Sequence, residues 1–288
     1  MDIIKEIVGM FKFLFSSSKP NNSSKPISKP PVQQVENKPI ETSVKVDSPV
    51  VEKPVEEVDD KVVITASHLY SLGITTKNVA TFLPLLNETI IQYKINTPIR
   101  VCHWLSQCMH ESENFKYLEE LASGEQYENN KELGNTEPGD GPKFRGKGVL
   151  QITGRFNYKK YGEFIEQDLL SGDNPKKLSQ PNLATYSSGW FWTILKKDKH
   201  GNNLNYYADN NDFIRITYTI NGGSTGLKMR FDKFRMCLSV FCNNEKETRI
   251  SEIKNRFLEI INKSDRTPME KVMFAAIPNV DALNKFLS

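Results

Sequence analysis

Residues 110–162 read HESENFKYLEELASGEQYENNKELGNTEPGDGPKFRGKGVLQITGRFNYKKYG, a stretch that joins closely spaced carboxylates to repeated glycines. Glu111 is followed eight and nine residues later by Glu119 and Glu120, after an aromatic-bearing segment that can fold the chain back. Two carboxyl groups can then approach each other across a cleft. Glycoside hydrolysis needs such a pair, because one protonated carboxyl donates to the leaving oxygen while an ionised one activates water or stabilises positive charge. Spacing alone is more typical of a solvated helix face.

Glu111 lies near the end of a helix predicted over residues 97–115, with Pro98 in its first turn. Helical spacing divides this segment into two faces. The apolar face carries Val101, Leu105, Cys108 and Met109, and the polar face carries His103, Gln107, His110 and Glu111. We therefore expect one buried face and one polar face that bears the carboxylate.

Apolar spacing predicts further helices on both sides of this stretch. They cover residues 64–73, 80–95, 184–197, 211–220 and 247–263, and the first has Thr65 or Ser67 as its N-cap and Gly73 just past its end. Glycine-rich segments at 134–154 and 221–226 interrupt the helices. The sequence therefore predicts a mainly α domain over 61–288, with a small β or loop element in its glycine-rich middle and a helical C-terminal extension over 245–288.

The first sixty residues differ in character from the rest. Residues 1–15 place apolar side chains on one helical face and charged ones on the other, which predicts an amphipathic helix. This helix is too short and too charged to span a bilayer, and it lacks the basic start and long apolar run of a secretory signal. It lies on a membrane surface, docks on a protein partner or packs against its own chain. Residues 16–60, rich in Ser, Pro, Lys and Glu, predict a disordered linker.

The composition argues against several kinds of partner and cofactor. A net charge of +3 over 288 residues is only mildly basic, so no nucleic-acid partner is expected. The four cysteines contain no CxxC pair, which predicts a reduced set. His103 and His110 have no third ligand at suitable spacing. We expect a monomer that needs no metal and no cofactor.

Residues 110–162 resemble the core of the family 19 glycoside hydrolases, a group of lysozyme-like chitinases and many bacteriophage endolysins. The matching features are the HES start, YE…LGNT.PGDG, FRGKG.LQITGR.NY and, downstream, TYTINGGSTG. ITASHLYSLGI, further upstream, is similar to the opening of the endolysin branch. The resemblance covers about residues 62–240 and implies a lysozyme-like α+β fold with a small β or loop element beside the cleft.

The resemblance also implies roles for individual residues. Glu111, directly after His110, becomes the general acid. The general base is Glu119 or Glu120, and Glu120 aligns better through the ELASG segment that it begins. Thr153 is implied to hold the attacking water. The residues implied to contact substrate are His110, Gln151, Asn157, Tyr158, Asn221 and Tyr127.

Two departures from the family pattern lie in the same stretch. Glu113 and Asn114 stand where the family often has a glycine pair, and Lys147 stands where it often has arginine. The assigned roles also set an expectation for ionisation: Glu111 is protonated in a poorly solvated site, and Glu120 is ionised nearer water.

The implied reaction is hydrolysis with inversion, in which water attacks in a single displacement without a covalent intermediate. We predict an endolysin-type peptidoglycan hydrolase that cleaves β-1,4 bonds between N-acetylated sugars of the bacterial cell wall. The alternatives are a chitinase on the same fold and a non-catalytic wall-binding or virion structural protein. Without a clear secretory signal, the chain is expected to be made in the cytoplasm and to act on the wall in host lysis, from a virion or in wall remodelling.

Overall fold

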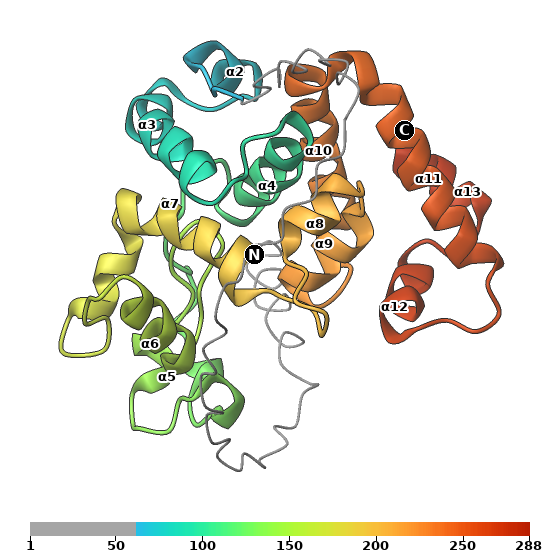
Figure 1. Ribbon diagram of the computed structural model, residues 1–288. Coiled ribbons are helices and arrows are strands. Elements are labelled where there is room, and N and C mark those ends of the chain that lie inside the picture. Colours follow the sequence, from blue (N-terminus) through green and yellow to red (C-terminus); the bar gives the residue numbers. More distant parts are fainter. Residues whose placement is uncertain (1–61) are drawn as a thin grey trace, which may run out of the picture. The chain divides into compact units, whose positions relative to one another are not determined.

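The computed structural model describes residues 62–288, so the helix predicted over 1–15 and the linker predicted over 16–60 lie outside the described residues. The described chain is mainly helical, as expected (Figure 1). Its longer helices are α3 (Thr76–Gln92), α4 (Pro98–Glu111), α6 (Arg155–Phe164), α7 (Pro181–Trp190), α10 (Leu227–Phe241) and α11 (Lys246–Asn262). Its shorter helices are α2 (Ala66–Ser71), α5 (Asp140–Lys143), α8 (Leu204–Asp209), α9 (Phe213–Asn221), α12 (Pro268–Ala276) and α13 (Val280–Leu287).

Local sequence signals explain where the first helices begin. The Thr65 hydroxyl accepts the His68 N–H at 3.2 Å, and the His68 ring accepts the Thr65 N–H in return, a capping box that starts α2. Thr65, rather than Ser67, is therefore the N-cap. Thr75 caps α3 by accepting the Asn78 N–H at 3.4 Å, so α3 starts before the predicted residue 80.

Helix α4 is buried on both faces as far as Met109, so most of its predicted polar face lies inside the protein. His103 and Gln107 have no exposed surface. The reason is that α8, α9 and α10 pack against α4, and Figure 1 shows α10 lying alongside it. Buried polar groups must be hydrogen-bonded. The His103 ring accordingly lies 3.0 Å from the Asn211 amide oxygen, and the Gln107 amide oxygen accepts from Arg230.

The glycine-rich middle consists of loops joined by single bridges. Antiparallel bridges pair Lys147 with Glu119 and with Ile152, and no longer strand occurs within residues 62–288. The Glu128 carboxylate accepts two backbone N–H groups of the 139–141 turn, each at 2.7 Å. These contacts hold the loops in place without a sheet.

Helix α10 was not among the expected helices, although it packs more extensively on α4 than any other element does. Its inner face carries Leu227, Phe231 and Phe234, but Arg230 interrupts this apolar stripe. Apolar side chains from α2 through α13 join in one core. No helix in the described part of the chain is long and apolar enough to cross a membrane.

A left-handed bend follows α4 directly. Glu113, Asn114 and Phe115 have φ of 49°, 56° and 65°, a conformation that side chains other than glycine adopt rarely. Glycine adopts this conformation without strain, which is consistent with its frequent occurrence at the first two of these positions in the family that residues 110–162 resemble. Ser112 closes the bend, since its hydroxyl donates to Cys108 O at 2.7 Å and accepts the Phe115 N–H at 2.8 Å.

We predict that Ser112→Ala lowers the free energy of unfolding by about 1–3 kcal/mol, because it leaves the buried Phe115 N–H without an acceptor. Urea denaturation would measure the loss. The matched control is Ser239→Ala, since Ser239 also donates to the carbonyl four residues earlier but is exposed. Equal effects of the two substitutions would show that the bend does not depend on Ser112.

Candidate functional site

The Glu120 carboxylate is held by three donors. It accepts from the Tyr127 hydroxyl at 3.1 Å, the Gln126 amide at 3.0 Å and the Gly146 N–H at 3.1 Å. The Glu120 residue as a whole is 6% exposed. Burial raises the pKa of the Glu120 carboxyl, and the donors partly offset that effect. Its backbone N–H also donates to Gly146 O at 2.8 Å, which fixes the carboxylate beside the Gly146 loop.

Gly146 leaves open the space into which three polar side chains point. A Cβ atom built there would lie 3.3 Å from Glu120 Oε2, 3.3 Å from Thr153 Oγ1 and 2.8 Å from Gln151 Oε1. The Thr153 hydroxyl donates its proton to Gln151 O at 3.0 Å, so its oxygen can only accept from another group. Glu120 and Thr153 therefore offer two acceptors to a donor, such as water, in that space.

Gln151 itself adopts a left-handed φ of 49°. Its amide donates to Gly148 O at 2.8 Å, which leaves its side-chain oxygen on the Gly146 side. Strained conformations of this kind concentrate at functional sites.

Glu119 points to different partners from its neighbour Glu120. Its carboxylate pairs with Arg145 at 2.8 Å and with Lys147 at 3.3 Å. Lys147 is 2% exposed and also donates to Lys143 O at 3.0 Å. This network ties Glu119 into the loop scaffold.

Two of the residues expected to contact substrate, Asn157 and Tyr158, instead hydrogen-bond to the backbone of the 145–153 loop. The Asn157 amide donates to Thr153 O at 2.8 Å and thereby orients the threonine. Tyr158 is completely buried, and its hydroxyl donates to Arg145 O at 2.7 Å. The expectation that Tyr158 contacts substrate is therefore corrected to a supporting role, because its ring cannot reach solvent. Tyr127 is 4% exposed and contacts Glu120.

Glu111 belongs to a second cluster, at the C-terminal end of α4. It forms a short ion pair with Arg230, which has no exposed surface, and the Glu111 side chain is 5% exposed. The same guanidinium donates to the Gln107 amide oxygen. His110 lies against Gly226, where a Cβ atom would be 2.5 Å from its Nε2. Burial and the nearby Arg230 and Lys233 lower the pKa of His110 to about 2, so its ring is neutral.

Asn221 lies near this cluster and is occupied by its own loop. Its amide donates to Thr225 O at 2.7 Å and its oxygen accepts the Gly223 N–H at 2.6 Å. Thr225 O also lies 3.4 Å from the Arg230 Nε. In this arrangement Asn221 shapes the 221–226 loop beside Arg230.

Both carboxyl groups are poorly solvated, which was expected of Glu111 but not of Glu120. Glu111 was expected to be protonated, but it is paired with a buried guanidinium. Glu120 was expected to be ionised near water, but it is buried and its pKa is raised. The partner of Glu111 lies 119 residues further along the chain, whereas Glu120 accepts from the nearby Gln126 and Tyr127 as well as from Gly146.

Sequence reasoning identified neither Arg230 nor Gly146 as part of the site. A signal for Arg230 exists in the sequence, since it is a cation inside the apolar stripe of Leu227, Phe231 and Phe234. Such a residue must have a buried partner. No comparable signal identifies Gly146, because its role depends on the side chains of Glu120, Gln151 and Thr153, which only the folded chain brings close to it. Among the described residues, no three potential metal ligands converge.

Comparison with known proteins gives the sequence relatives of this chain. No family model matches the chain. A Haemophilus influenzae protein named as containing a glycosyl hydrolase family 19 domain is 26% identical over 163 residues, covering 46% of this chain and 75% of that protein. Two Arabidopsis thaliana endochitinases are 27% identical, over 57% and 63% of this chain. The chain spans about half the length of these plant relatives, 47% and 54%.

Solved structures with similar folds are also chitinases. A chitinase C variant has a TM-score of 0.49 at 18% identity and covers 64% of this chain and 94% of its own. Chitinase C from Streptomyces griseus has a TM-score of 0.46 at 19% identity, over 62% of this chain and 76% of its own. The assignment therefore rests on the sequence relatives. They define a glycoside hydrolase. The chain is similar in sequence to members of family 19 of these enzymes.

We predict that Gly146→Ala lowers turnover about ten-fold or more, because the methyl group fills the space shared by Glu120 and Thr153. The measurement is the initial rate of fragment release, with the thermal midpoint recorded to show that the domain is folded. Gly223→Ala is the control, since a Cβ there meets only Asn221 Oδ1 at 3.5 Å. A Gly146→Ala enzyme with parental turnover would remove this space from the active site.

Proposed function

We propose that the protein is a peptidoglycan hydrolase of the endolysin type, which cleaves β-1,4 bonds between N-acetylated sugars with inversion. One observation carries the chemistry: the Glu120 carboxylate and the Thr153 hydroxyl converge on the space above Gly146. A water molecule there donates one proton toward Glu120 and the other toward Thr153, which leaves a lone pair for the sugar carbon.

In this proposal Glu120 is the general base and Glu111 the general acid. Inversion requires the two carboxyl groups to act from opposite faces of the sugar ring, and they belong to two separate clusters. The contacts of Glu119 with Arg145 and Lys147 support Glu120 as the base, because Glu119 is already neutralised by two cations. Arg230 orients Glu111, which binds a proton from solvent and delivers it to the leaving oxygen, while Glu120 takes the proton of the attacking water and later returns it to solvent.

The choice of peptidoglycan rests on the form of the motif at 127–141, which resembles the endolysin branch. The specific alternative is chitin, because two of the similar proteins are named as endochitinases. Mass spectrometry of the fragments released from purified peptidoglycan and from chitin oligomers separates the two substrates. Fragments from chitin alone would establish the chitinase.

A wall-binding protein without activity is the alternative from another class. In the leading proposal, by contrast, the enzyme hydrolyses the glycan of the bacterial cell wall during host lysis or from a virion. Binding of the full chain to walls without release of any fragment would support this alternative.

We predict that Glu111→Gln and Glu120→Gln each lower turnover by about 100- to 10,000-fold, whereas Glu119→Gln lowers it much less. Glutamine keeps the size of the side chain but cannot transfer a proton. The measurement is the rate of fragment release by folded protein. If Glu119→Gln were the more damaging of the neighbouring pair, the general base would be Glu119.

A substrate with an activated leaving group separates the two roles. Such a leaving group departs without protonation, so an aryl glycoside should restore part of the turnover of the Glu111→Gln enzyme and not of the Glu120→Gln enzyme. Restoration of the Glu120→Gln enzyme instead would exchange the roles.

The acidic limb of the pH–rate profile should lie above pH 4.5, the ordinary pKa of a glutamic acid side chain, because burial raises the pKa of Glu120. The base works in its ionised form, so activity is present above the raised pKa and is lost as the pH falls through it. The measurement is kcat/KM from pH 3 to 9. An acidic limb below pH 4.5 would exclude Glu120 as the base.

A further inference from the structure

A second pocket lies at the other end of α4 from Glu111. It has a volume of about 580 Å³ and is built from the end of α3, the first turn of α4, the π-helical turn Phe191–Leu195, the segment after that turn and α8. Arg100 and Glu111 are eleven residues apart on α4, so about 16 Å separates them along the helix axis. The pocket is therefore distinct from the two clusters described above. Its lining includes Gln92, Lys94, Ile194, Lys197, Asn203 and Tyr206.

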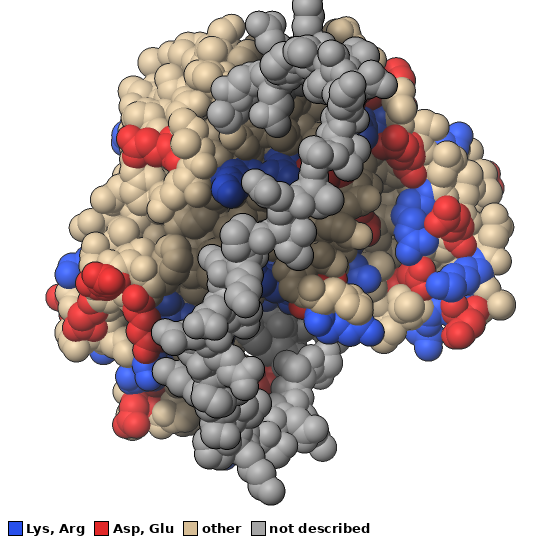
Figure 2. Space-filling model, in the orientation of Figure 1, with Lys and Arg blue, Asp and Glu red and all other residues tan. Residues whose placement is uncertain are grey.

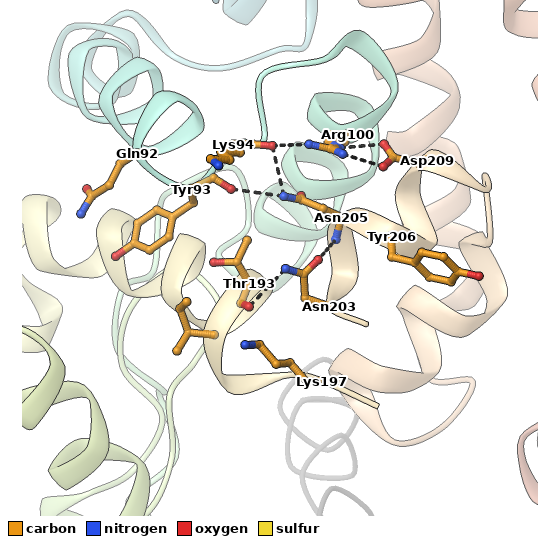
Figure 3. Close-up of a pocket in the computed structure, with 11 residues that line it drawn as sticks. Gln92, Tyr93, Lys94, Arg100, Thr193, Lys197, Asn203, Asn205, Tyr206 and Asp209 are labelled. Carbon is orange, nitrogen blue, oxygen red and sulfur yellow. Dashed lines mark hydrogen bonds and ion pairs between the residues drawn. The ribbon is translucent and has the colours of Figure 1, made fainter. Parts of the chain in front are cut away.

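Most polar groups of this pocket build its wall. Arg100 pairs with both carboxylate oxygens of Asp209 at 2.6 Å and donates to Lys94 O at 2.7 Å. The Asn205 amide donates to the carbonyls of Tyr93 and Lys94 at 3.2 and 3.1 Å. Figure 3 shows the side-chain amides of Asn203 and Asn205 in the middle of the set. These groups are satisfied within the protein and give the pocket a fixed shape.

The ammonium groups of Lys94 and Lys197 take no part in these wall contacts among the described residues. Lys94 and Lys197 are exposed, and within the described part of the chain neither side chain has a hydrogen-bond or ion-pair partner. Lys94 has a φ of 53° just past the end of α3, a position that glycine usually occupies. Because Asp209 neutralises Arg100, the two lysines leave the pocket with an excess positive charge. Figure 2 shows Lys and Arg side chains above and below a hollow in the middle of this face.

The pocket also offers apolar surface. Tyr206 is 49% exposed and Ile194 is 43% exposed, and both belong to the lining. A ligand that fits these features carries carboxylate groups for the lysines and small apolar groups for the two side chains. A neutral sugar chain has no group that would balance the two charges.

We propose that this pocket binds a short peptide with free carboxylates, the chemistry that distinguishes the stem peptides of peptidoglycan from chitin. The choice of ligand rests on the proposed wall substrate. The pocket would hold the wall polymer through its peptide while the glycan strand is cleaved at a separate place on the domain.

The test measures binding without turnover. N-acetyl-L-alanyl-D-glutamate carries two carboxylates, and its diamide carries none. NMR titration of the full chain should show that the dipeptide binds and that the diamide binds at least about ten-fold more weakly. Lys94→Gln with Lys197→Gln should weaken binding of the dipeptide about three- to thirty-fold, since two exposed ion pairs are lost.

The matched control is Lys77→Gln with Lys199→Gln, which removes the same charge from two exposed lysines outside the pocket. It should leave binding unchanged. Equal binding of the dipeptide and the diamide, or an equal effect of the two double variants, would overturn the proposal. Tighter binding of glycerol phosphate than of the dipeptide would assign the pocket to a phosphate polymer and overturn it as well.

Turnover distinguishes this inference from the proposed function. On peptidoglycan the Lys94→Gln, Lys197→Gln enzyme should show a raised KM with kcat unchanged, and on wall glycan stripped of its peptides both should be unchanged. If the parental enzyme releases fragments from chitin alone, the proposed function fails, while dipeptide binding still tests the pocket independently.

Discussion

The arrangement of the site depends on the buried ion pair between Glu111 and Arg230. Arg230 has no exposed surface, so its charge requires a partner inside the protein. Glu111 and Gln107 supply that partner from successive turns of α4, and the pair thereby joins α4 to α10. Removing one member of a buried pair typically costs about 3–5 kcal/mol, so the position of Glu111 is strongly determined. The catalytic proposal and the packing of the two central helices thus share one interaction.

The connection from Glu111 to Glu120 is equally constrained. The chain leaves α4 through three left-handed residues and Ser112 closes that bend with two hydrogen bonds. It then runs to Glu120, whose backbone and carboxylate are both bonded to Gly146. The carboxylates are therefore held from different sides, one by a helix and one by a glycine-rich loop. The Glu111 carboxylate therefore faces a guanidinium, whereas the Glu120 carboxylate faces neutral donors.

Charge has different uses in the two parts of the domain. Arg230 is paired with Glu111, and Arg145 and Lys147 are paired with Glu119, and these pairs hold helices and loops in position. In the pocket at the other end of α4, Arg100 is paired, but Lys94 and Lys197 have no ion-pair partner among residues 62–288. Paired charges determine shape, whereas unpaired charges in a formed pocket are available to a ligand.

The sequence by itself determined the local features of this protein. Thr65 caps α2 through a residue three positions away, and apolar spacing marked α3, α4, α7, α9 and α11. The motif in residues 110–162, which contains Glu111, Glu120 and Thr153, also predicted the similarity to family 19 glycoside hydrolases that the sequence relatives show. Only the tertiary structure decided that the polar side of α4 is buried, that Arg230 is the partner of Glu111, and that Glu120 is the less solvated neighbour of Glu119. The physical reason is range: a cap or an apolar stripe is specified within a few residues, whereas burial and ion pairing depend on side chains that only the folded chain brings together.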